Sequence, residues 1–139
     1  MFLAKILSGS LRHCRVEGYS MLPTLAPKDI VIFRPTNEQD LSLKEGCLVV
    51  VSHPLKPEVL MIKRIYRLTQ HGFDLRGDNE VGSIDSRQFG LVNNFCLRGI
   101  VEQVFKVQTA QIGPFGSFKK LKQKFFEAKR ILLQLIAHQ

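Results

Sequence analysis

Short runs of β-branched and aliphatic residues recur between residues 14 and 108, and glycine, proline, asparagine or aspartate separates them. Runs of this length between turn residues are typical of β-strands. The predicted strands are Ile30–Arg34, Cys47–His53, Val59–Leu68, Phe73–Arg76 and Leu97–Gln108. The prolines of this region lie between the runs or at their ends, where a missing N–H does least harm to a sheet. The pattern therefore predicts a mainly β fold.

A different pattern begins near residue 112. Two glycines and a proline within residues 112–116 end the strand pattern, and Ser117 is suited to cap a helix. Apolar residues then recur at helical spacing among lysines and an arginine; they are Phe118, Leu121, Phe125, Leu132 and Leu135. We therefore expect a β-rich domain over residues 1–116 and a basic amphipathic helical tail over residues 117–139. Two interpretations of the tail stay open: it packs on the β domain, or it lies on an anionic membrane surface or a partner protein.

The formal net charge of +8 is concentrated in this tail, where residues 117–139 hold six basic residues and one acidic residue. The β-rich domain therefore carries little net charge, which argues against a nucleic-acid partner. The three cysteines, Cys14, Cys47 and Cys96, are too widely spaced to predict a zinc site or a disulfide framework. The apolar runs are far shorter than the roughly 20 residues of a membrane span, and residues 1–7 do not resemble a signal peptide. We expect a cytoplasmic chain whose tail is a candidate peripheral membrane contact.

Ser20 is the first candidate for chemistry. It follows Gly18 and precedes Pro23, so a turn there is expected to present its hydroxyl beside free backbone N–H groups that suit an oxyanion. An ordinary turn serine is the alternative interpretation.

Lys63 lies in a strand that is rich in apolar residues, and the two-residue period of a strand places it on one face with Met61 and Ile65. Such surroundings disfavour the ammonium form and lower the pKa of a lysine. Lowering this pKa from about 10.4 to about 8 corresponds to roughly 3 kcal/mol. A neutral amine of this kind is a suitable base for a serine nucleophile, whereas the alternative is a surface lysine on an edge strand.

The segment from Gly77 to Arg87 has an unusual density of polar and turn residues. Ser83 is suited to hold the lysine amine by a hydrogen bond, and Asp85 and Arg87 are suited to pair with each other and fix the loop. A solvated turn is the alternative interpretation.

Together, the segments S-M-L-P-T-L, I-K-R-I and G-D-N-x-x-x-S-x-D-S-R-x-F-G resemble the type I signal peptidase group of serine/lysine endopeptidases, over about residues 16–102. The resemblance implies a signal-peptidase-like β-barrel or β-ribbon catalytic domain that needs no cofactor or metal. It makes Ser20 the nucleophile, Lys63 the general base and Ser83 the residue that orients the lysine. The positions with an implied structural role are Gly18, Asp78, Asn79, Asp85 and Arg87. Some family members carry a side-chain oxyanion donor at the position of Gly18, so the Ser20 backbone N–H is the expected donor here.

The implied partner is a precursor protein with an N-terminal leader peptide. Because only 19 residues precede Ser20, and we expect no membrane anchor among them, the preferred subfamily is one of compact, anchorless members, which the chain resembles: the maturation peptidases of nickel-type superoxide dismutase. Three alternatives stay open: a general signal peptidase I-like enzyme for exported proteins, a self-cleaving repressor or mutagenesis-protein fold, and a non-catalytic membrane- or protein-binding module. The histidines also leave a Ser-His-Asp triad formally open, although no motif places one beside Ser20.

Overall fold

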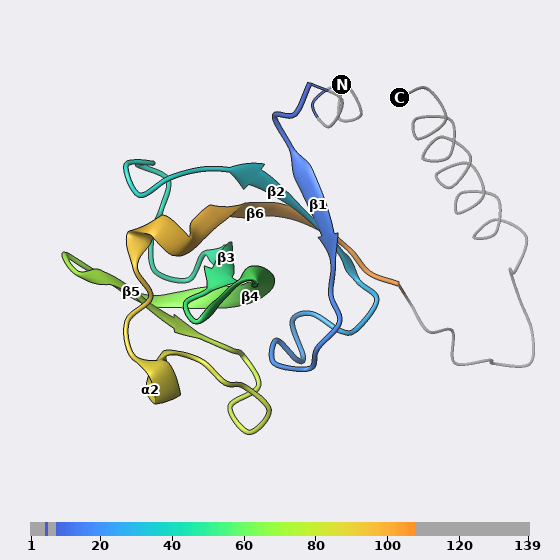
Figure 1. Ribbon diagram of the computed structural model, residues 1–139. Helices are drawn as coiled ribbons and strands as arrows, with labels where there is room; N and C mark the ends of the chain where they lie inside the picture. The colour runs from blue at the N-terminus through green and yellow to red at the C-terminus, as the bar shows by residue number, and fades with distance from the viewer. Residues whose placement is uncertain (1–4, 6–7, 108–139) are drawn as a thin grey trace, which may run out of the picture. The chain divides into compact units, whose positions relative to one another are not determined.

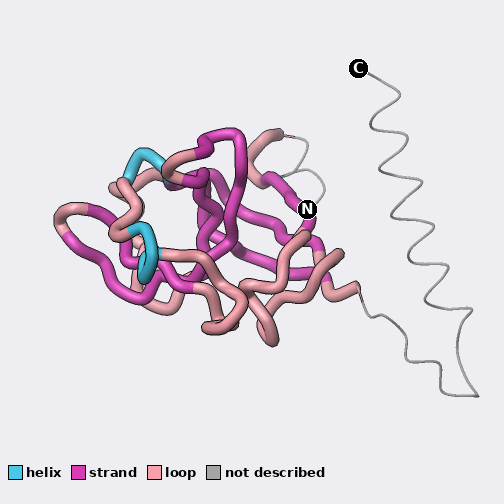
Figure 2. Tube along the Cα trace, turned by 60° about the horizontal axis from the view of Figure 1, so that its bottom comes forward, coloured by secondary structure: helices cyan, strands magenta, loops and turns pink. Residues whose placement is uncertain are grey.

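The computed structural model describes residue 5 and residues 8–107, and the six strands of this region form one antiparallel sheet (Figure 1). The strands are β1 (Arg12–Arg15), β2 (Ile30–Pro35), β3 (Leu48–His53), β4 (Lys56–Thr69), β5 (Gly72–Arg76) and β6 (Leu97–Phe105). Their order in the sheet is β1-β2-β6-β3-β4-β5, and every pairing is antiparallel. A short helix α2 (Ser86–Phe89) and a 3-10 turn (Asn94–Cys96) lie between β5 and β6 (Figure 2).

The mainly β prediction is confirmed, and each of the five predicted strands is present with small shifts at its ends. β6 ends at Phe105, before the predicted end, because the N–H of Val107 is donated to the side chain of Asp29 and not to a neighbouring strand. The sequence did not predict β1, whose four residues R-H-C-R lack an apolar alternation. The predicted helical tail and the domain boundary at residue 116 lie outside the described residues and stay predictions.

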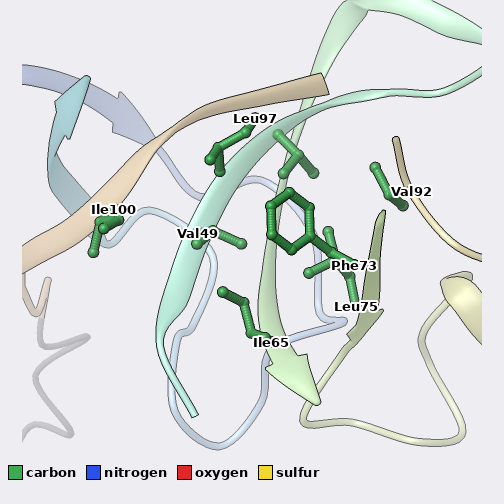
Figure 3. Close-up of a cluster of buried hydrophobic side chains, with 8 residues drawn as sticks. Val49, Ile65, Phe73, Leu75, Val92, Leu97 and Ile100 are labelled. Carbon is green, nitrogen blue, oxygen red and sulfur yellow. The ribbon is translucent and has the colours of Figure 1, made fainter. Parts of the chain in front are cut away.

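Two apolar clusters are built around the sheet. The first, shown in Figure 3, contains Val49, Val51, Ile65, Phe73, Leu75, Val92, Leu97 and Ile100. The second contains Val16, Met21, Leu25 and Val31. Fully burying a side chain of this kind stabilises a fold by about 1.5–3 kcal/mol, so these clusters fix the strands on which the polar residues lie.

β4 contributes to both clusters, because successive residues of a strand point to opposite faces. Met61 and Ile65 pack with the first cluster, and Ile62 packs with the second. The register pairs Val49 of β3 with Lys63 of β4. Along β4, Lys63 lies between Met61 and Ile65, which both pack with the first cluster.

Within residue 5 and residues 8–107, no helix has the length and apolar character that a membrane crossing requires.

Candidate active site

The turn that carries Ser20 is fixed by two buried side chains. Met21 and Leu25, which are 2% and 0% exposed, anchor it in the second cluster. The N–H of Leu25 donates to the carbonyl of Met21 at 2.8 Å, and the N–H of Leu22 donates to the carbonyl of Tyr19 at 3.1 Å. Ser20 itself is half-buried. Because Met21 and Leu25 are buried in the core, the turn holds the accessible Ser20 at a defined place on the domain.

The amine of Lys63 is buried, since the residue is only 3% exposed. Its Nζ donates a hydrogen bond to Oγ of Ser83 at 2.9 Å. Burial lowers the pKa of Lys63 below its ordinary value, the nearby charge of Asp85 opposes this shift, and the charge of Arg87 adds to it. Compared with a surface lysine, a larger fraction of this amine is therefore neutral near physiological pH.

Ser83 connects this amine to a fully buried carboxylate. Its Oγ donates to Oδ2 of Asp85 at 2.6 Å, and Asp85 is 0% exposed. The proton of the Ser83 hydroxyl is thus committed to Asp85, and the oxygen of Ser83 is left to accept from Lys63. This direction of hydrogen bonding fixes the orientation of the lysine amine.

The Asp85 carboxylate has several further donors. Arg87 donates from Nε to Oδ1 at 3.0 Å and from Nη2 to Oδ2 at 2.8 Å, and the N–H of Gly77 donates at 2.8 Å. Burial raises the pKa of Asp85, but the hydrogen bonds from Arg87, Gly77 and Ser83 outweigh it and hold this pKa well below the usual range. Asp85 is therefore a charged and satisfied group, and the pair that the sequence predicted between Asp85 and Arg87 is present.

Asp85 also begins helix α2, which the sequence analysis missed. Its side chain accepts from the backbone N–H of Gln88, and the side chain of Gln88 accepts from the N–H of Asp85, so these two residues form a capping box. The side chain of Asp85 also accepts from the N–H of Arg87. The spacing from Asp85 to Gln88 was the available signal. Four helical residues are too few for a period to be recognised, so only this capping pair reveals the helix.

Gly77 lies between the backbone of Ser20 and the side chain of Ser83, the hydrogen-bond partner of Lys63. A Cβ atom at residue 77 would lie 2.2 Å from Oγ of Ser83 and 2.4 Å from the carbonyl oxygen of Ser20. Since Ser83 is hydrogen-bonded to Lys63, the lysine and the Ser20 backbone border the same small region. Among the hydrogen bonds of the described residues, none joins Oγ of Ser20 directly to Nζ of Lys63.

Asn79 secures the Ser20 segment to the same loop. Its N–H donates to the carbonyl of Ser20 at 3.0 Å, and its Nδ2 donates to the carbonyl of Tyr19 at 3.1 Å. The side-chain oxygen of Asn79 accepts from the N–H of Gly82 at 3.2 Å, which closes the loop on itself. Gly18 is exposed, and a Cβ there would meet no atom within 4 Å. Its structural role stays a prediction.

The ion pair between Arg64 and Asp78, together with a hydrogen bond from Thr24, joins the three motifs at a second point. Of these three residues, only Asp78 was predicted to belong to the site. Arg64 donates from Nε and Nη2 to the two oxygens of Asp78 at 2.8 and 2.7 Å, and the hydroxyl of Thr24 also donates to Asp78. Arg64 lowers the pKa of Asp78, burial opposes the shift, and Thr24 supports it. Asp78 was expected to be structural, but Arg64 and Thr24 were missed because 14 and 54 residues separate them from Asp78.

A metal centre is not formed by the described part of the chain, where no three His, Cys, Asp or Glu side chains gather as a ligand set.

Comparison with known proteins places the chain in a class of peptidases. Residues 3–94 match the family described as Peptidase S24-like, and the chain belongs to that family. It is also similar to the mitochondrial inner membrane protease subunit 1 of Xenopus tropicalis, with 26% identity in an alignment of 144 positions, gaps included, that covers 83% of this chain and 82% of the relative. The motif resemblance to type I signal peptidases is finer than this family match and stays a prediction.

Proposed function

We propose that this chain is a serine endopeptidase in which Ser20 is the nucleophile and Lys63 is the general base, and that it removes an N-terminal leader from a precursor protein. The observation that carries the proposal is the buried Lys63 amine, hydrogen-bonded to Ser83 beside the segment of Ser20. Membership of a peptidase family supports the class of reaction. The similarity to a mitochondrial inner membrane protease subunit supports the processing of other proteins.

The arrangement around Lys63 suits an acyl-enzyme mechanism. A neutral amine has two N–H donors and one lone pair; one donor goes to Ser83, and the lone pair is free to accept the Ser20 proton. Oγ of Ser20 then attacks the scissile carbonyl, and the Ser20 backbone N–H donates to the oxyanion. The Lys63 ammonium returns the proton to the leaving amine, which departs with the second half of the peptide. A water that gives its proton to Lys63 then attacks the carbonyl of the acyl-enzyme ester. The Lys63 ammonium returns that proton to Oγ of Ser20 as the ester C–O bond breaks, which releases the carboxylate product and restores both residues.

Ser83, Asp85 and Arg87 act in this scheme through Lys63. Ser83 holds the amine in place, and Asp85 holds Ser83. Arg87 neutralises the buried carboxylate, which limits how far the charge of Asp85 favours the ammonium form. These three residues are therefore positioning residues and do not touch the substrate.

The proposal names two classes of precursor. The motif resemblance points to the precursor of a nickel-type superoxide dismutase, whose N-terminal extension would be the leader. The mitochondrial relative points to a broader leader peptidase, for which a secretory precursor with a small-residue cleavage site of the Ala-Xaa-Ala kind is a suitable probe.

The proposal is tested by incubating the full chain separately with these two precursors and locating the cut by mass spectrometry. We expect one defined cut that releases the leader from at least one precursor and leaves the mature protein intact. Both precursors remaining whole under conditions in which the chain is folded would overturn the proposed activity. Cleavage of the superoxide dismutase precursor alone would assign the narrower substrate.

The pH dependence of the rate should follow the proton of Lys63. Because burial lowers this pKa, kcat/KM is expected to rise with pH through a midpoint below the ordinary lysine value of about 10.4. Arg87→Met removes a positive charge that disfavours the ammonium form, so the midpoint should move upward.

The matched control is Arg12→Met, which removes an exposed arginine from β1, at the other edge of the sheet from β5. It should leave the midpoint unchanged. An equal midpoint in the wild-type chain and Arg87→Met, with both folded, would contradict the part assigned to Arg87.

A further inference from the structure

A second buried carboxylate lies at the end of the loop that follows Ser20. Asp29 is 1% exposed, and its Oδ2 accepts from the N–H of Ala26 and from Nζ of Lys106, both at 2.9 Å. Its Oδ1 accepts from the N–H of Val107 at 3.0 Å. Burial raises the pKa of Asp29, but the hydrogen bonds from Ala26, Lys106 and Val107 together hold it below its ordinary value. Asp29 is therefore a charged, satisfied partner for Lys106.

Lys106 has a second contact that reaches the turn of Ser20. Its Nζ also donates to the carbonyl of Thr24, the residue whose hydroxyl donates to Asp78. The Lys106–Asp29 ion pair thus holds the backbone of Thr24, and the Arg64–Asp78 ion pair holds its side chain. Since Thr24 follows Ser20 by four residues in one turn, both pairs act on the segment that carries the proposed nucleophile.

We propose that Lys106, with Asp29 as its counter-ion, is a positioning residue for Ser20, an inference that rests on the proposed function. It fixes the carbonyl of Thr24 and so the backbone direction of the turn that presents both the Ser20 hydroxyl and the Ser20 N–H. Misplacing a reacting group by about 1 Å costs roughly 100-fold in rate. Lys106 comes just after β6, 77 residues from Asp29, and the described contacts give it no bond to Lys63, Ser83 or Asp85.

This placement separates two kinds of effect. Loss of Lys106 should lower kcat, because the nucleophile is less well placed in the transition state. Loss of Lys106 should leave the pH midpoint of the rate unchanged, because the pKa of Lys63 is set by its burial and by the charges of Asp85 and Arg87. A general loss of stability would instead lower the amount of folded enzyme and leave kcat per folded molecule unchanged.

The test measures kcat, KM and the pH midpoint of Lys106→Met on the two precursors named above, with folded enzyme quantified by circular dichroism. We expect kcat to fall by roughly 10- to 100-fold, with KM within about threefold of the wild-type value and an unchanged midpoint. Lys106→Arg, which keeps a cation that reaches both acceptors, should recover most of the rate. Lys56→Met, at an exposed lysine of β4, is the matched control and should retain the wild-type kcat.

The outcomes distinguish this inference from the proposed function. A wild-type kcat in Lys106→Met, with Ser20→Ala inactive, would overturn the positioning part and leave the peptidase mechanism standing. Cleavage of neither precursor by the wild-type chain would overturn both. If Lys106→Met does not fold, Lys106→Gln replaces it, because the amide retains N–H donors without the charge. A wild-type kcat in Lys106→Arg together with a reduced kcat in Lys106→Gln would support the inference. Equal kcat values in these two variants would overturn it.

Discussion

Ser20→Ala and Lys63→Met should each abolish precursor cleavage without unfolding the chain. Ser20→Ala removes the oxygen that forms the acyl-enzyme, and Lys63→Met removes the base while keeping a side chain of similar length among apolar neighbours. General base catalysis alone contributes about 100- to 10,000-fold, so we expect losses of at least this size. Mass spectrometry of the precursor after a long incubation measures the residual activity.

The matched controls for this pair are Ser10→Ala and Lys56→Met. Both change exposed residues of the same types, one just before β1 and one at the start of β4. They should retain full activity and the wild-type melting temperature. Complete processing by either Ser20→Ala or Lys63→Met would refute the assignment of the two residues as nucleophile and base.

Gly77→Ala is expected to have the second-largest effect. The added Cβ would lie 2.4 Å from the carbonyl oxygen of Ser20, a backbone atom, and 2.2 Å from Oγ of Ser83. Either the Ser20 segment or Ser83, the hydrogen-bond partner of Lys63, must therefore move away from residue 77. We expect kcat to fall by about 100-fold, and the free energy of unfolding to fall by roughly 1–3 kcal/mol through overpacking.

Gly99→Ala separates the steric cost from the catalytic effect. A Cβ at this position of β6 would lie 2.4 Å from the backbone oxygen of Arg34 and 2.6 Å from the ring of Phe33. Its cost in stability should be similar, but it adds no atom beside Ser20 or Ser83. Measuring kcat per folded molecule for both variants decides the matter, and equal losses in the two would show that Gly77 has no special part in the site.

The sheet was largely predictable because short runs of β-branched and aliphatic residues recur between turn residues, as in β2 and β3. The two-residue period of a strand placed Lys63 on one face with Met61 and Ile65, which is the face that packs in the first cluster. β1 escaped prediction because backbone hydrogen bonds to β2, and not burial, define it. Its exposed arginines are typical of an edge strand, where charge discourages pairing with another chain.

The site was predictable only in part, and distance along the chain explains the difference. Asp85 and Arg87 are two residues apart, so their pairing follows from local sequence. Lys106 and Asp29 are 77 residues apart, and their contact depends on the adjacent placement of β2 and β6 in the sheet. No local pattern carries that information. The proposed roles of Ser20, Lys63 and Ser83 rest on the combined motifs, since each motif alone also fits an ordinary turn or strand.

The most direct test of the central claim is a pH titration of the Lys63 amine in the folded, full-length chain. The Cε resonance of Lys63, identified by its loss in Lys63→Met, reports the protonation of the adjacent Nζ. The mechanism predicts a midpoint clearly below the ordinary value of about 10.4 and equal to the midpoint of kcat/KM. An ordinary lysine midpoint, or one that differs from the midpoint of the rate, would contradict a neutral Lys63 as the base for Ser20.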